Sequence, residues 1–171
     1  FARQLGMIDL PAVTADDKTH WTGCEERVRS SRSDTRSKAS IDELMHSIGR
    51  LSQQCWEVAG VNRSTSGMQR LLTQTKTAIN PLEQEELLRM VDHQPRTQLL
   101  ELEEPSRQEL NLLLDLLHRQ RTSALLLEAC LFRAESRGGH FRGDAPCSLP
   151  QWRRHSRQLR GQRIHTRQVT D

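Results

Sequence analysis

The residues best suited to chemistry lie in one short segment, 135–144, which reads Glu-Ser-Arg-Gly-Gly-His-Phe-Arg-Gly-Asp. In an extended backbone His140, Arg142 and Asp144 would point to the same side, because side chains alternate along a strand. An imidazole, a guanidinium and a carboxylate placed together can pair with each other or bind a charged partner. Two interpretations therefore stay open: a helix cap with an internal Arg–Asp pair, or a polar surface that docks on another domain and helps to shape a site there.

The same segment is expected to end the longest apolar helix of the chain. Arg137 would lie in the last turn of that helix, where a cation faces the partial negative charge of the unsatisfied carbonyls. Gly138 and Gly139 would follow, and glycine adopts the left-handed conformation that ends many helices because it has no Cβ. A cap needs only the glycine, so the ionisable residues after it indicate a contact surface.

A second group of cations lies in the tail. Six arginines occur between residues 153 and 167, with Trp152 beside them. This stretch can meet phosphates, in which case binding would be strongly salt-sensitive, or it can wrap an acidic face of its own protein. The formal net charge of +3 is too small to indicate a nucleic-acid-binding protein by itself.

No catalytic, cofactor-binding or metal-binding residue is predicted in this chain. The sequence contains no glycine-rich nucleotide loop, no nucleophile elbow and no zinc-protease motif. The four cysteines show no C-x-x-C spacing, and no Cys/His cluster has the spacing of zinc ligands. Cys55 and Cys130 lie among apolar residues at helical spacing, so we expect them to be buried, reduced thiols.

Composition predicts a compact middle with two poorly packed ends. The chain has 171 residues, enough for one domain with a core, but only 35% of them are hydrophobic. Residues 8–38 and 137–171 are strongly polar, whereas 40–135 is rich in leucine. The sequence shows no signal peptide and no apolar run long enough to span a bilayer. It also opens without an initiator Met, as a piece of a longer protein would.

Apolar residues recur every three or four positions through the middle of the chain, which is the spacing of amphipathic helices. Helical segments are expected at residues 40–59, 64–79, 82–92, 96–103 and 107–137. No strand is expected. The predicted fold class is all-α: a three- to four-helix bundle with a long central helix and an irregular C-terminal tail.

Two capping boxes mark expected helix starts. Ser40 and Glu43 have the right spacing at the start of the first helix, and Ser106 and Glu109 have it at the start of the last. In such a box the serine hydroxyl and the carboxylate each accept a hydrogen bond from a backbone amide that has no partner in the helix.

Other residues set the remaining boundaries. Gly60 is expected to end the first helix, Ser64 to cap the second, and Pro81 to break it. Trp56, near the end of the first helix, is assigned to the core. Residues 14–39 have the Ser- and charge-rich composition of a linker.

Two segments carry a family resemblance. The stretch from Glu135 to Pro146 resembles the E-S-R-G-x-H-x-R-x-D-x-P motif of the succinate dehydrogenase/fumarate reductase flavoprotein family. The stretch from Trp56 to Arg63, Trp-Glu-Val-Ala-Gly-Val-Asn-Arg, looks like the W-E-x-x-G-I/V-x-R turn between the first two helices of that family's C-terminal domain. The spacing of the two segments and the tail are similar to the L-aspartate oxidase branch more than to the respiratory flavoproteins.

The resemblance implies a C-terminal helical domain with a structural and domain-docking role in an FAD-dependent, cytoplasmic enzyme. L-Aspartate oxidases convert L-aspartate to iminoaspartate and pass hydride to FAD; quinolinate synthase, a possible pathway partner, uses the product in NAD biosynthesis. FAD and substrate belong to the flavin and capping domains, which no position here matches, so this chain alone is expected to be inactive. The residues expected to contact those domains are Arg63, Arg137, Gly138, His140, Arg142 and Asp144.

The resemblance also divides the chain. Residues 1–39 would be the end of the flavin domain and a polar linker, 40–137 the helical bundle, and 138–171 an extended Arg-rich tail packed on the bundle or on the flavin domain. Two alternatives stay open. One is the same domain of a fumarate reductase or succinate dehydrogenase flavoprotein, and the other is a free-standing helical interaction module whose basic tail binds nucleic acid.

Overall fold

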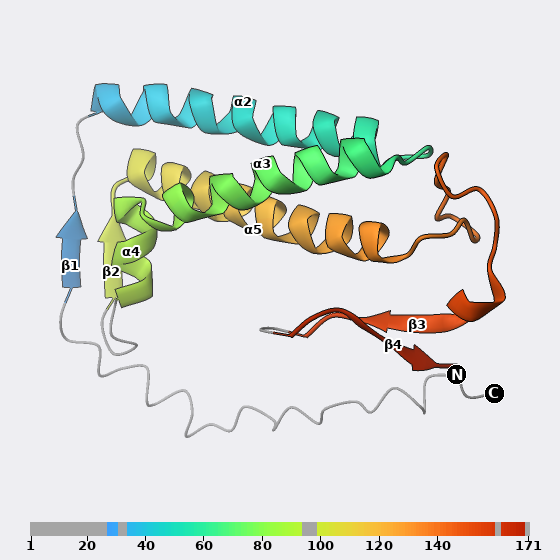
Figure 1. The fold of residues 1–171 in the computed structure, drawn as a ribbon. Coiled ribbons are helices and arrows are strands. Elements are labelled where there is room, and N and C mark those ends of the chain that lie inside the picture. The colour runs from blue at the N-terminus through green and yellow to red at the C-terminus, as the bar shows by residue number, and fades with distance from the viewer. Residues whose placement is uncertain (1–26, 31–33, 94–98, 160–161, 170–171) are drawn as a thin grey trace, which may run out of the picture.

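The fold is a bundle of helices flanked by two short sheets (Figure 1). The computed structural model describes residues 27–30, 34–93, 99–159 and 162–169. Its elements in chain order are β1 (Arg27–Ser30), α2 (Asp34–Ala59), α3 (Thr65–Glu83), α4 (Glu86–His93), β2 (Leu99–Leu102), α5 (Glu104–Phe132), a 3₁₀ turn (Pro150–Trp152), β3 (Arg154–Arg157) and β4 (His165–Gln168). Across these described residues, the predicted all-α class and helical bundle are confirmed.

The long helix α5 is the central member of the bundle, as predicted. It packs against α2 and α3 along its length, and the short α4 covers it near its N-terminal end. Its 29 residues give it a length of about 44 Å at 1.5 Å per residue. Figure 1 shows α2, α3 and α5 side by side, with α4 at one end and the loop that follows α5 at the other.

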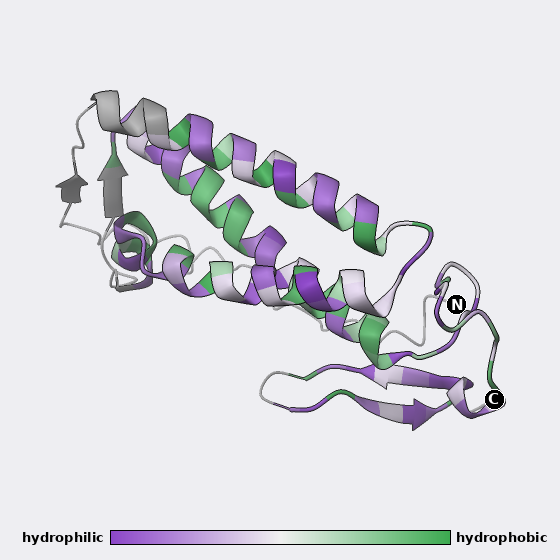
Figure 2. Ribbon diagram, turned by 45° about the horizontal axis from the view of Figure 1, so that its top comes forward, coloured by the Kyte–Doolittle hydropathy of each residue, from purple (hydrophilic) through white to green (hydrophobic). Residues whose placement is uncertain are grey.

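Leucines form the main core between α2, α4 and α5. The buried members of this cluster are Leu44, Leu51, Leu87, Leu88, Leu113, Leu116 and Leu117. Figure 2 shows the alternation that produces it, with hydrophobic residues on parts of each helix and hydrophilic residues between them. Full burial of one leucine contributes about 1.5–3 kcal/mol, so this cluster is sufficient to hold the helices together.

A second, smaller core lies at the other end, where α2 ends and α3 begins. It consists of Ala59, Met68, Leu71, Leu127 and Cys130, and the side chains of Met68 and Leu127 are completely buried. It therefore joins the last turns of α2 and α5 to the first half of α3.

Neither predicted capping box forms. Helix α2 begins at Asp34, well before Ser40, and α5 begins at Glu104 with Pro105 in its first turn, a position that proline favours. The hydroxyl of Ser40 instead donates to Oε1 of Glu109 at 2.8 Å. One residue from each expected cap is thus used to join α2 to α5, because the facing helices bring the half-buried Ser40 to the buried Glu109.

Two of the expected helix ends are confirmed. Helix α2 stops at Ala59, immediately before Gly60. Ser64 caps α3, since its Oγ accepts a hydrogen bond from the amide of Gly67 at 3.3 Å.

Pro81, in contrast, does not break α3, which continues to Glu83. A proline removes a backbone hydrogen bond from a helix. Here Ile79 and Leu82 pack against the main core, and this packing outweighs the loss so close to the end of the helix.

The first sheet was not predicted from the sequence. Residues 99–102, expected within a helix over 96–103, form β2, which pairs in parallel with β1. Strand β1 lies in the stretch that was interpreted as linker, and α2 begins before that stretch ends. A parallel partner far away in the chain leaves no local signal. The rest of the expected linker and the segment before it, residues 1–26 and 31–33, lie outside the described residues.

The second sheet is an antiparallel hairpin in the tail, which was expected to be irregular. Strand β3 pairs with β4 so that Arg154 faces Gln168 and Arg157 faces His165. Both sheets lie beside the helices, and neither enters the middle of the bundle (Figure 1).

Candidate functional site

The polar segment predicted from the sequence lies at one end of the bundle, beside the turn between α2 and α3 (Figure 1). That turn covers residues 60–64 and the loop after α5 covers 133–149; together they form the hub. Backbone hydrogen bonds join the two parts. The amide of Arg63 donates to the carbonyl of Phe141 at 3.2 Å, and the amide of Gly143 donates to the carbonyl of Arg63 at 2.9 Å. The two motifs found in the sequence are therefore in direct contact.

Arg142 is the buried centre of the hub, with 4% of its surface exposed. Its Nη1 donates to the carbonyls of Leu131 at 3.3 Å and Arg133 at 3.2 Å, at the C-terminal end of α5. The last carbonyls of a helix have no partner within the helix and carry partial negative charge. Arg142 therefore caps α5 from the loop that follows it.

Asp144 accepts hydrogen bonds from the two remaining nitrogens of this guanidinium. Nε and Nη2 of Arg142 donate to its two carboxylate oxygens at 3.1 and 2.7 Å, and the hydroxyl of Thr65 donates to the same carboxylate. Thr65 is the first residue of α3, where negative charge is favourable. The bonds from Arg142 and then Thr65 hold the pKa of Asp144 well below its usual value. The internal Arg–Asp pair, one of the two interpretations of the sequence, is present.

Arg63 caps α2 in the same way and also fixes His140. Its Nε donates to the carbonyl of Ala59 at 2.9 Å, and its Nη1 lies 2.8 Å from Nδ1 of the His140 ring. Nε2 of that ring lies 3.1 Å from the carbonyl of Arg133. A carbonyl only accepts and a guanidinium only donates, so the imidazole is neutral and carries its proton on Nε2. Burial is the main cause that lowers the pKa of His140, and the nearby guanidinium groups add to it.

Arg137 lies outside α5, contrary to the prediction, because the helix ends at Phe132. Its Nε and Nη2 donate to the two carboxylate oxygens of Glu135 at 3.0 Å. Glu135 is completely buried and also accepts a hydrogen bond from the amide of Leu149 at 2.8 Å. The hydrogen bond from Arg137 is the main cause that lowers the pKa of Glu135. The chain leaves the helix early because Glu135 must reach these donors.

Gly138 has the predicted left-handed conformation, with φ +56°, but it closes a hairpin turn and does not end a helix. The backbones of Arg137 and His140 exchange two hydrogen bonds, of 2.8 and 3.0 Å, around Gly138 and Gly139. A glycine with positive φ at the first central position is typical of such two-residue turns. The turn directs His140 back toward Arg63.

Ser136 within the hub and Thr65 beside it take part in its hydrogen bonds, although the sequence did not single them out. The hydroxyl of Ser136 donates to the carbonyl of Ala145 at 2.8 Å and accepts from the amide of Arg142 at 2.9 Å. Ser136 is the second residue of the E-S-R-G motif, and its place in that motif is the sequence signal that could have identified it. Nothing local marks Thr65, which contacts Asp144 only because of the tertiary fold.

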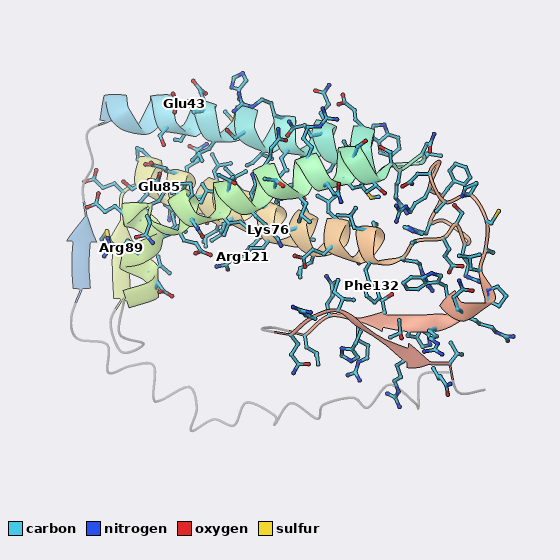
Figure 3. All side chains as sticks on the ribbon, viewed as in Figure 1. Glu43, Lys76, Glu85, Arg89, Arg121 and Phe132 are labelled. Carbon is cyan, nitrogen blue, oxygen red and sulfur yellow. The ribbon has the colours of Figure 1, made fainter. Side chains whose placement is uncertain are left out.

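Arg133 was also missed, and it attaches the C-terminal hairpin to the hub. Its Nη2 donates to the carbonyls of Trp152 at 2.8 Å and Arg154 at 2.9 Å. Phe132, labelled in Figure 3, points from the end of α5 toward the hairpin, where its ring meets the Trp152 ring edge to face with centroids 5.4 Å apart.

The outer face of this hairpin is basic. Side chains alternate between faces along a strand. Gln158, the residue after β3, donates to the carbonyl of Leu125 in α5 at 3.0 Å, whereas all four residues of β3 are exposed. The face opposite to Gln158 carries four exposed basic side chains in cross-strand pairs, His155 with Arg167 and Arg157 with His165.

The cysteines agree only in part with their prediction. Cys130 is buried, and burial raises the pKa of its thiol. Cys55 is half-buried, with its Sγ 3.3 Å from Oγ of Ser123. Cys147 is exposed, and none of these three cysteines forms a disulfide.

The hub is built to hold helix ends together. The predicted contact residues Arg63, Arg137, Gly138, His140, Arg142 and Asp144 all lie in it. Arg63 pairs with His140 and Arg142 with Asp144, whereas Arg137 pairs with Glu135 and keeps 41% of its side chain exposed. Their role as interdomain contacts stays a prediction. Among the residues that the structure describes, no three His, Cys, Asp or Glu side chains are grouped so that they could hold a metal ion. Within the same residues, no helix combines the length and apolar character needed to cross a membrane.

The hub does not fit FAD. The diphosphate of a dinucleotide binds at a glycine-rich turn that leads into a helix N-terminus. The helix that begins in the hub is α3, and Asp144 already accepts a hydrogen bond from its first residue. A second anion at this position would be repelled by the carboxylate.

The comparisons with known proteins match this domain. The family model described as "Fumarate reductase flavoprotein C-term" matches residues 48–170, a range that includes both halves of the hub. The chain belongs to this family. The fumarate reductase flavoprotein C-terminal family thus accounts for the bundle, the hub and the hairpin, and the family resemblance predicted from the two motifs is confirmed.

One relative points to a particular branch of the family. An L-aspartate oxidase from Synechocystis sp. (strain ATCC 27184 / PCC 6803 / Kazusa) is 28% identical over 157 residues, which cover 91% of this chain and 27% of the relative. The chain therefore spans about a quarter of the length of that relative. No solved structure matches the chain.

Proposed function

We propose that this chain is the C-terminal helical domain of an FAD-dependent L-aspartate oxidase, which converts L-aspartate to iminoaspartate in NAD biosynthesis. The observation that carries the proposal is the similarity to the Synechocystis L-aspartate oxidase over 91% of the chain. FAD and substrate bind to flavin and capping domains outside this chain. The chain divides, in this proposal, into a connection from the flavin domain (1–39, of which α2 already takes the last residues), the bundle (40–137, with its last helix ending at Phe132) and a tail (138–171) that packs on the bundle or on the flavin domain.

In this enzyme the domain has a structural and docking role. Arg142 and Arg63 cap the ends of α5 and α2, and this supports a rigid end of the bundle next to the flavin domain. The enzyme works in the cytoplasm, and its product passes to quinolinate synthase, the pathway partner. Within the hub, Arg137 has the most accessible cation, with 41% of its side chain exposed, and it is the first candidate for a polar contact across the domain boundary.

The test uses the complete enzyme that contains this chain. We expect the purified enzyme to show the visible absorbance of bound flavin and to oxidise L-aspartate, whereas the 171-residue chain alone is colourless and inactive. Oxidation of succinate without oxidation of L-aspartate would overturn the proposal. That result would favour the second member of the same class, a fumarate reductase or succinate dehydrogenase flavoprotein, whose name the family model carries.

A second candidate function, binding of double-stranded nucleic acid, is favoured by the basic outer face of the β3–β4 hairpin. A two-stranded ribbon fits the major groove of B-DNA, and phosphate contacts from the two arginines of this face would lower the affinity roughly 12-fold between 50 and 200 mM salt. Binding of the complete protein to a DNA duplex at these two salt concentrations tests this candidate. Absence of binding at the lower concentration eliminates it.

A further inference from the structure

Exposed apolar side chains gather beside the hub. Trp56 is 73% exposed, Val61 76%, Leu126 48% and Phe141 42%; these four residues form the apolar end face. They line one open hollow of about 690 Å³. A soluble surface with large apolar groups grouped in this way marks an interaction site, whereas single exposed apolar residues do not.

The sequence assigned Trp56 to the core, and within this chain that assignment is wrong. Trp56 lies in the last turn of α2, where its side chain lines the hollow together with Leu126 of α5. Leu126 of α5 is also half exposed. Both residues are as apolar as core residues, yet nothing in the described part of this chain covers them.

Gly139 gives a second, independent observation. Its φ is not positive, and a Cβ added to it would meet no atom within 4 Å. Neither backbone conformation nor packing within this chain therefore requires glycine at this position. Gly139 also lines the hollow, and a glycine on an interaction surface permits close approach of another backbone.

The hub makes this face rigid. Phe141 is held through its carbonyl by the amide of Arg63 at 3.2 Å, and Trp56 accepts from the amide of Gly60 at 3.1 Å. Nε and Nη1 of Arg63, which also lines the hollow, are directed to Ala59 and His140. The face therefore offers mainly aromatic and aliphatic surface, and its counterpart is apolar.

We infer that the apolar end face is the surface on which the flavin-binding part of the complete enzyme packs, with an apolar side chain of that part seated between Trp56 and Phe141. The inference rests on the proposed function. The chain covers only 27% of the length of its L-aspartate oxidase relative, so a protein of that length has a large second body to bury this face. Buried aromatic anchors with a polar rim are the usual composition of such an interface.

The test compares two valines in the complete, flavin-loaded enzyme. Val61 lies on the apolar end face, and Val91 lies on α4 at the other end of the bundle with 40% exposure. Val61→Cys and Val91→Cys are prepared separately, treated with a maleimide, and the labelling rate of each new cysteine is followed by peptide mass spectrometry. The two changes are identical and conservative, so both variants are expected to fold.

We expect Val61→Cys to be labelled roughly tenfold or more slowly than Val91→Cys in the native enzyme, with equal rates after denaturation, because only opening of the interface would expose it. Labelling of Val61→Cys as fast as that of Val91→Cys would overturn the inference. Protection that disappears on dilution of a dimer to monomer would also overturn it, since a second copy of the chain would then cover the face.

The activity of the same preparations separates the two proposals. Turnover of L-aspartate together with rapid labelling at Val61→Cys refutes the docking surface and leaves the proposed function intact. Protection at Val61→Cys in a flavoprotein that does not oxidise L-aspartate refutes the proposed function and retains the surface.

Discussion

Replacement of Arg142 by alanine is the most informative single perturbation of the hub. The change removes the donor that satisfies the carbonyls of Leu131 and Arg133 and that forks to Asp144. With only 4% of Arg142 exposed, water cannot easily replace it. Asp144 is 37% exposed and stays hydrated without its partner, so the loss is that of hydrogen bonds from a charged donor, about 1.5–3 kcal/mol. For a chain of this size that corresponds to a fall in the melting temperature of roughly 3–12 °C.

Urea unfolding of the 171-residue chain, followed by circular dichroism, measures this loss as a change in the free energy of unfolding. Arg119→Ala is the matched control, because Arg119 also donates to an aspartate, Asp115 at 2.8 and 2.9 Å, but its side chain is 48% exposed. We expect Arg119→Ala to cost about 0.3–0.5 kcal/mol. If Arg142→Ala costs no more than Arg119→Ala, the hub is not the joint described here.

Two further predictions concern the same loop. Burial lowers the pKa of His140, so the folded state favours the neutral ring. The contribution of His140 to the free energy of unfolding is therefore complete above the ordinary pKa of about 6.5 and declines as the pH falls below it. His140→Gln, which can keep a donor toward Arg133 and an acceptor toward Arg63, should flatten this decline in urea unfolding between pH 7.5 and pH 5, and an unchanged slope would contradict the neutral ring assigned to His140. Gly138→Ala should lower the free energy of unfolding by about 1 kcal/mol, because φ at Gly138 is +56°. Gly139→Ala should leave the free energy of unfolding of the isolated chain within about 0.5 kcal/mol of the parent value. Equal effects at the two glycines would contradict the turn geometry described here.

The helices could be predicted from the sequence because their signals are local. The spacing of leucines identified α2, α3 and α5, and Gly60 and Ser64 marked two boundaries that the structure confirms. The signals failed where a distant contact decided the outcome. Ser40 has the pattern of a cap, but Glu109 lies opposite it across the bundle. Strand β2 forms because β1 lies beside it, and no pattern within residues 99–102 contains that information.

The sequence predicted where the polar residues of the hub lie in the chain, but not which groups they contact. The alternation of His140, Arg142 and Asp144 correctly indicated one polar unit, and the Arg142–Asp144 pair is present. The sequence could not show that Arg142 would reach back to carbonyls of α5, or that Thr65 would join the pair from another helix. These contacts depend on the crossing of the loop over the α2–α3 turn.

The inward orientation of the hub explains why a charged motif lies next to an apolar surface. If Arg63 and Arg142 pointed outward, they would have to be desolvated whenever a second body covered this end, and such desolvation often exceeds the gain from pairing. In the folded chain both groups already have partners at helix ends. The desolvation of these charges is therefore compensated by hydrogen bonds within the domain, which exist before another domain packs against it. What faces outward is therefore Trp56, Val61 and Phe141, whose burial is favourable without further charge compensation.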